Sequence, residues 1–255
     1  MTSESQPIIE PQVIPLTPAK PQRQLIAPVW HTVVMVTLIL LNSWGASGGH
    51  LSSTTNRSGR IVLYAGTFIL QFVLFLLIWF GISRKKVKMR ELIGGRWHSP
   101  EDFLIDLGIA VGFWIVSALV IGGLKIAMGL VDLHNPTQSL NQMKQALGPV
   151  IPQTRVELAA FLGLTVFAGL FEEIIFRGYL QRQLGALAGN IYVGVIGSAI
   201  LFGAAHGYQG VRLMVLIAIY GSLFGIMAVL RKSLRPGMMA HAWQDAFSGI
   251  ALFFS

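Results

Sequence analysis

Seven apolar runs, separated by polar segments, constrain this chain more than any other feature. They cover residues 28–44, 61–82, 103–130, 156–176, 191–206, 212–230 and 237–254. Their lengths are close to the roughly 20 residues that a helix needs to cross a bilayer. Hydrophobic residues make up 53% of the 255 residues and charged residues only 12%, whereas an average soluble domain is about 25% charged. We therefore predict an all-α, polytopic transmembrane bundle of about seven spans.

The basic residues are divided unevenly between the segments that connect these runs. If the amino terminus is cytoplasmic, 13 Lys and Arg fall in cytoplasmic segments and five in outer ones. The cytoplasmic set is Lys20, Arg23, Arg84, Lys85, Lys86, Lys88, Arg90, Arg96, Arg177, Arg182, Arg231, Lys232 and Arg235. The outer set is Arg57, Arg60, Lys144, Arg155 and Arg212, and Lys125 lies within the third run. This is the positive-inside pattern, which explains the net charge of +8 without a nucleic-acid partner.

The chain divides into three parts by composition. Residues 1–27 hold five of the 11 prolines and no apolar core, so they predict a disordered cytoplasmic tail rather than a signal peptide. Residues 28–155 contain the first spans and a polar outer segment with a short helix around residues 138–146. Residues 156–255 are glycine-rich and hold most of the buried ionisable groups. The absence of cysteine excludes disulfides and thiolate chemistry, and no internal repeat supports a transporter built from duplicated halves.

Two adjacent acids, Glu172 and Glu173, end the fourth apolar run, and Arg177 follows them. A carboxylate at the centre of a bilayer helix costs roughly 2.5–3.5 kcal/mol, so the pair is not retained for stability. If the helix continues to about Leu184, Glu173 and Arg177 share a face at the spacing of a helical ion pair. Glu172 then points about 100° away and is free to handle a proton. The alternative is that both acids cap a basic cytoplasmic boundary.

Two later runs carry further polar side chains. His206 ends the fifth run, and His241 and Asp245 lie four residues apart in the seventh, on one helix face. Each of these, taken alone, is compatible with a structural role. Polar groups in three separate spans instead indicate a shared site that uses water inside the membrane. In the sixth run, Gly221 and Gly225 form a small-xxx-small pair that permits close helix packing.

Together these residues resemble the three ordered motifs of the CPBP family. That family groups the type II CAAX prenyl endopeptidases with bacterial Abi-type and bacteriocin-immunity-type membrane proteins. The motifs are Glu172-Glu173-x-x-x-Arg177, Phe202-x-x-x-His206 and His241-x-x-x-Asp245. The resemblance covers roughly residues 156–250, and it implies a bacterial intramembrane protease in the inner membrane.

The resemblance also implies roles for the site residues. Glu172 and His206 would activate the attacking water, and His241 and Asp245 would stabilise the oxyanion. Glu173 and Arg177 would hold the site together. Prenyl-protein enzymes often carry asparagine at the position of Asp245. An ionised Asp245 would repel an oxyanion, so this residue must either be protonated to donate or only orient His241.

A metal is the alternative to a glutamate-type mechanism. Glu172, His206 and His241 could ligate zinc with one position left for water. The His-Glu-x-x-His signature is absent, and we expect no cofactor.

Convergence of these residues requires a long, tilted fourth helix and a sunken cavity, which we expect to open to the cytoplasmic side. The expected substrate is a peptide, leader sequence or membrane-protein tail rather than a farnesylated CAAX protein. Two other functions fit the same residues: a non-catalytic relative that regulates a partner such as a sensor kinase, and a proton-coupled transporter. The sequence does not indicate an oligomeric state.

Overall fold

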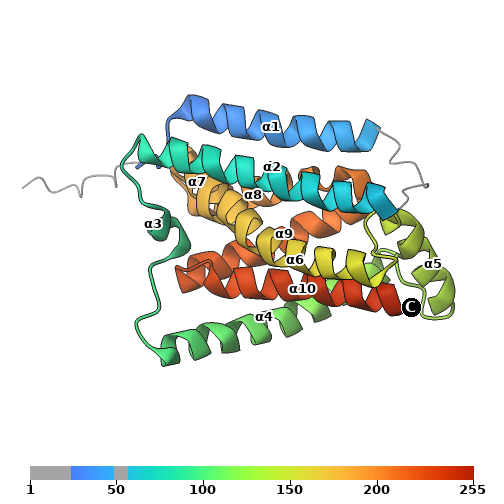
Figure 1. The fold of residues 1–255 in the computed structure, drawn as a ribbon. Coiled ribbons are helices and arrows are strands. Elements are labelled where there is room, and N and C mark those ends of the chain that lie inside the picture. The colour runs from blue at the N-terminus through green and yellow to red at the C-terminus, as the bar shows by residue number, and fades with distance from the viewer. Residues whose placement is uncertain (1–23, 49–56) are drawn as a thin grey trace, which may run out of the picture.

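The computed structural model describes residues 24–48 and 57–255, and every regular element in these ranges is helical. The longer elements are α1 (Val29–Gly48), α2 (Arg57–Ser83), α4 (Pro100–Ala127), α6 (Arg155–Glu172), α8 (Ile191–Ala205), α9 (Val211–Arg231) and α10 (Arg235–Phe254). The shorter ones are α3 (Met89–Ile93), α5 (Pro136–Leu147), η1 (Glu173–Leu180), α7 (Gln181–Ala188) and η2 (Gly207–Gln209). The long helices lie side by side as one bundle, with α3 near one end and α5 at the other (Figure 1). The predicted all-α class is confirmed.

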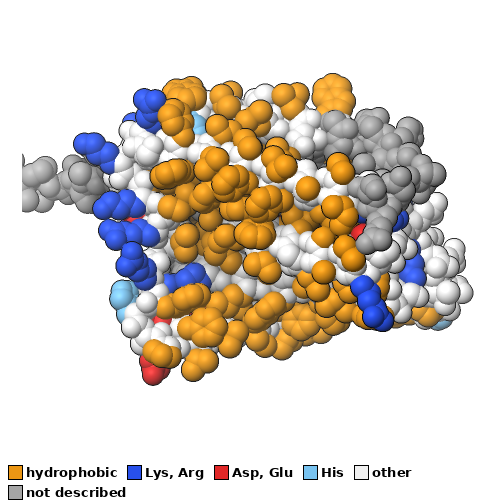
Figure 2. Space-filling model, viewed as in Figure 1, with side chains coloured by type: hydrophobic (Ala, Val, Ile, Leu, Met, Phe, Trp, Pro, Cys, Tyr) orange, Lys and Arg blue, Asp and Glu red, His pale blue; other side chains and the backbone are white. Residues whose placement is uncertain are grey.

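Each of the seven predicted runs lies largely on a helix, and within the described residues four helices are long and apolar enough to cross a membrane. These are Gly59–Ser83, Pro100–Ala127, Arg155–Ala188 and Val211–Arg231, while Val29–Trp44 and Ile191–Ala205 are shorter apolar helices. Large apolar side chains such as Ile69, Leu119 and Val166 are exposed on the outside of the bundle. Figure 2 shows apolar side chains covering the middle of the visible face. Lipid must cover this surface, so the chain is an integral membrane protein.

The fourth predicted helix is longer than its apolar run and changes its winding. It begins at Arg155 with a capping box between Thr154 and Glu157, which satisfies two free backbone N–H groups. It continues through η1 and α7 to Ala188 and ends at Gly189, whose φ of +68° is readily adopted by glycine. The middle section, Glu173–Leu180, is π-helical and entirely buried. Such wide turns are rare and often lie at functional sites.

Close helix packing depends on the two predicted glycines of α9. A Cβ on Gly221 would lie 3.0 Å from the Phe202 ring, and one on Gly225 would lie 2.7 Å from the Gln181 amide oxygen. Their missing side chains therefore let α9 approach α7 and α8, as the small-xxx-small pattern predicts.

The first described residues are anchored to the central helix, which is the continuous helix formed by α6, η1 and α7. His31 of α1 is buried, and its ring contacts the Tyr179 hydroxyl at 2.7 Å and the Leu77 carbonyl at 2.8 Å. Gln183 accepts hydrogen bonds from the backbone N–H groups of Ile26 and Ala27. The end of the predicted tail is therefore packed against α7, while residues 1–23 lie outside the described residues.

One further prediction concerns a connecting region. The short helix expected around residues 138–146 is present as α5.

Asp106, which the sequence interpretation passed over, is fully buried in α4 and binds Arg231 and Arg235, both at 2.9 Å. The Trp97 indole also donates to Asp106 at 2.7 Å. This cluster joins α4 to the ends of α9 and α10 that lie nearest to α3.

Candidate active site

The predicted ion pair between Glu173 and Arg177 is present and completely buried. The two side chains are 3.0 Å apart, and each is 1% exposed. The guanidinium lies 4.3 Å from the centre of the Phe202 ring and donates a 3.2 Å hydrogen bond to the Gly221 carbonyl. Arg177 was counted among the cytoplasmic cations, and this assignment was wrong because the continuous helix carries it into the protein interior.

A second contact of the same kind lies one turn further along. Gln181 donates a 3.1 Å hydrogen bond to the carbonyl of Gly225. Arg177 and Gln181 are four residues apart, as are their acceptors, Gly221 and Gly225. The two glycines thus expose backbone carbonyls as well as leaving space, and the central helix is attached to α9 at two consecutive turns.

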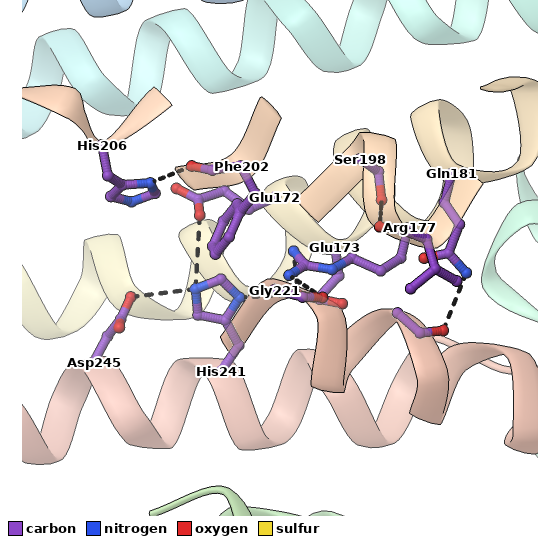
Figure 3. Close-up of polar contacts among 12 residues, drawn as sticks. Glu172, Glu173, Arg177, Gln181, Ser198, Phe202, His206, Gly221, His241 and Asp245 are labelled. Carbon is purple, nitrogen blue, oxygen red and sulfur yellow. Dashed lines mark hydrogen bonds and ion pairs between the residues drawn. The ribbon is translucent and has the colours of Figure 1, made fainter. Parts of the chain in front are cut away.

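His241 of α10 lies among three carboxylates. Its Nδ1 is 3.1 Å from Glu173, and its Nε2 is 3.6 Å from both Glu172 and Asp245. Since Glu173 accepts from Nδ1–H, the ring is fixed with Nε2 directed at the other two acids (Figure 3). Glu173 therefore holds His241 as well as neutralising Arg177, a link that the sequence interpretation did not include.

His206 has its tautomer fixed by the end of its own helix. The last carbonyls of a helix lack backbone partners within it, and the Phe202 carbonyl accepts a 2.8 Å hydrogen bond from His206 Nδ1. Nδ1 is therefore the protonated nitrogen of the neutral ring. The lone pair of Nε2 remains available to accept a hydrogen bond.

A cavity of about 310 Å³ brings the predicted residues together. Four of the six line it: Glu172, His206, His241 and Asp245. Glu173 and Arg177 lie behind it in the core. The expected convergence of three spans is thus present.

The cavity lies in a different half of the bundle from the one expected. Its wall includes residues 150–152, before α6, and Tyr208 and Gln209 of η2. These segments are at the α5 end, whereas the Lys- and Arg-rich loop around α3 is at the other end (Figures 1 and 2). His206 follows the last turn of α8 and so lies away from the basic loop, while the opening toward the cytoplasmic side stays a prediction.

Several polar side chains at the cavity were not predicted. Gln71 of α2 donates a 2.7 Å hydrogen bond to Glu172, and Tyr208 and Tyr220 also line the wall. Burial raises the pKa of Tyr208, so its hydroxyl keeps its proton and can donate. The signal for Gln71 was available: a lone amide within an apolar membrane run is a candidate functional residue.

The described residues contain no group of three or more His, Cys, Asp or Glu side chains arranged to hold a metal ion. In both imidazoles Nδ1 already has a protein partner. The choice between a metal-dependent and a metal-free reaction stays a prediction.

Comparison with known proteins agrees with the location of this site. The comparisons with curated proteins and with solved structures gave no match. One family model matches residues 154–247, and its description is type II CAAX prenyl endopeptidase Rce1-like. This range contains all six predicted site residues, and the matched family is a protease family. Residues 154–247 therefore form a domain of the Rce1-like type II CAAX prenyl endopeptidase family.

Proposed function

We propose that the chain is a glutamate-dependent intramembrane endopeptidase that hydrolyses a peptide bond of a membrane-associated protein or peptide. The observation that carries the proposal is that one cavity collects Glu172, His206, His241 and Asp245 from three separate parts of the fold. The family match supports the protease assignment. The proposed location is a bacterial inner membrane with the amino terminus in the cytoplasm.

The first step is activation of water by Glu172 and His206. Gln71 binds one carboxylate oxygen of Glu172, which leaves the second oxygen to accept from water. The Nε2 lone pair of His206 is a second acceptor on the cavity wall. A water molecule that donates to both presents its oxygen lone pair to the substrate carbonyl carbon. As the new C–O bond forms, Glu172 takes the proton, and general-base catalysis of this kind contributes roughly 10²–10⁴-fold.

The second step is stabilisation of the oxyanion and departure of the amine. With both nitrogens protonated, His241 donates a hydrogen bond from Nδ1–H to Glu173 and directs Nε2–H into the cavity. A protonated Asp245 adds a donor, while an ionised Asp245 only orients His241. When the C–N bond breaks, the proton on Glu172 passes to the leaving nitrogen. Peptide and water thus become a carboxylic acid and an amine.

Glu173 and Arg177 have a supporting role in this mechanism. Neither side chain lines the cavity, and their ion pair fixes His241 through Glu173 Oε1. The proposed substrate is a peptide, a leader sequence or the tail of a membrane protein.

The test is substitution of the three cavity residues, with membrane expression measured in parallel. Glu172→Gln, His206→Ala and His241→Ala should each abolish cleavage, measured as new peptide termini in a strain that lacks the protein and carries each variant. Glu101→Gln is the matched control, because this acid lies on the exposed start of α4. Full complementation by all three cavity variants would exclude the enzyme and favour a regulator of a partner protein. A transporter would instead lose ion flux without any change in peptide termini.

A further inference from the structure

The two ends of the bundle differ strongly in charge. In the described part of the chain, ten Lys and Arg lie at the α3 end, on the loop after α2 and near the ends of α7, α9 and α10. They are Arg84, Lys85, Lys86, Lys88, Arg90, Arg96, Arg182, Arg231, Lys232 and Arg235. The α5 end carries six: Arg57, Arg60, Lys125, Lys144, Arg155 and Arg212. Figure 2 shows the basic side chains gathered at the α3 end.

The catalytic cavity is closed toward this basic end. Immediately beyond Glu172 and His241, the interior is filled by Arg177, Phe224 and Leu234, each no more than 2% exposed. The Asp106 cluster closes the same end between α4, α9 and α10. No residue of the loop between α2 and α4 lines the cavity. Water and substrate therefore reach the site through the other half of the bundle.

That other half supplies most of the cavity wall. The lining runs from Glu172 and His241, near the middle of the bundle, past Phe161 and Ser248 to the connection before α6 and to η2. Apart from the residues near the middle, these segments lie toward the ends of helices that face away from the basic loop. The expected cytoplasmic amino terminus and the expected cytoplasmic cavity therefore cannot both hold.

The positive-inside rule decides between them. Lys and Arg in short loops near span ends set the orientation of a membrane protein, and the α3 end has the excess. We infer that the cavity opens away from the cytoplasm and that the substrate is a peptide segment of an exported or membrane protein on that side. This inference rests on the proposed function for its reaction and on the fold for its direction.

The cavity wall also limits the composition of that segment. Among the described residues it includes the carboxylates of Glu172 and Asp245 and the imidazoles of His206 and His241, but no Lys or Arg. Most other lining side chains are apolar or aromatic, such as Tyr64, Phe161 and Leu252. A segment with apolar side chains therefore fits this wall.

The absence of cysteine allows a direct test of direction. Gln153→Cys places one thiol at the exposed connection before α6, and Lys85→Cys places one on the exposed basic loop. Neither residue lines the cavity. In intact bacterial spheroplasts, a membrane-impermeant maleimide should label Gln153→Cys, and should label Lys85→Cys only after permeabilisation. The reverse pattern would overturn the inference.

A second measurement tests where the substrate is accepted. A fluorescence-quenched peptide with apolar, uncharged side chains is added to sealed right-side-out vesicles and to detergent-solubilised protein, with Glu172→Gln as the inactive control. We expect cleavage of this peptide in both preparations. Cleavage confined to solubilised protein would overturn the inferred direction and leave the proposed function standing. Cleavage in neither preparation would overturn the proposed function, while the labelling pattern would still decide the direction.

Discussion

Gln71 Nε2 lies 2.7 Å from Glu172 Oε1, so α2 directly holds the carboxylate that the proposed mechanism uses as its base. Gln71 lies outside the matched domain, which begins at residue 154. Its amide oxygen is buried without a hydrogen-bond partner in the described part of the chain. The contact determines which oxygen of Glu172 remains free.

Replacing Gln71 with leucine should lower kcat with little change in KM. Hydrogen bonds to charged groups contribute about 1.5–3 kcal/mol, and their loss in the transition state corresponds to roughly 10–100-fold in rate. Thr67→Val is the matched control, since Thr67 also lines the cavity from α2 but bonds to Leu63 of its own helix. Steady-state kinetics of both variants test this. An unchanged kcat, or a rise in KM alone, would contradict the positioning role.

Much of the fold could be predicted because a bilayer imposes it. Apolar runs long enough to cross lipid must form helices, which satisfy their own backbone groups. Contacts within one helix could also be predicted, as the spacing of Glu173 and Arg177 shows. Both the helices and their internal contacts depend only on residues that are near one another along the chain.

Contacts between helices could not be predicted in the same way. Gln71 and Glu172 are 101 residues apart, and Asp106 and Arg231 are 125 apart, so no local spacing joins them. The direction of the cavity depends on the position of His206 after the last turn of α8 relative to η1 and α10. The apolar runs locate the helices along the chain but do not indicate how far one helix is displaced along another.

Glu173→Gln should reduce stability as well as activity, unlike Glu172→Gln. Breaking a buried ion pair by removing one partner costs about 3–5 kcal/mol, because the other charge stays buried without compensation. Here that charge is Arg177, which is 1% exposed. Glu172 is 15% exposed and faces the cavity, so its amide variant should unfold close to the wild-type temperature. Thermal unfolding in detergent measures both, and equal stability of the two variants would contradict the assigned roles.

Alanine at Gly225 should destabilise the packing of α9 against α7. The new Cβ would lie 2.7 Å from the Gln181 amide oxygen and 3.0 Å from Val195, so these groups must move. Overpacking of this kind costs typically about 1–3 kcal/mol. Gly112→Ala in α4 is the matched control because nothing lies within 4 Å of its added Cβ. Alanine is the better helix former by about 1 kcal/mol, so the control should unfold at the same or a higher temperature. Equal loss of stability in both variants would contradict the packing argument.

Exhaustive chelation should leave turnover unchanged. His241 directs Nδ1 to Glu173, His206 directs Nδ1 to the Phe202 carbonyl, and Glu172 has one oxygen bound by Gln71. These contacts arrange the three side chains to handle water and protons, the roles that the glutamate-type mechanism requires. The measurement is peptide hydrolysis by purified protein before and after chelation, together with the metal content per chain. Glu172→Gln serves as the inactive baseline in both conditions. Loss of activity that stoichiometric zinc restores would instead make Glu172, His206 and His241 metal ligands and replace the proposed base with a metal-bound water.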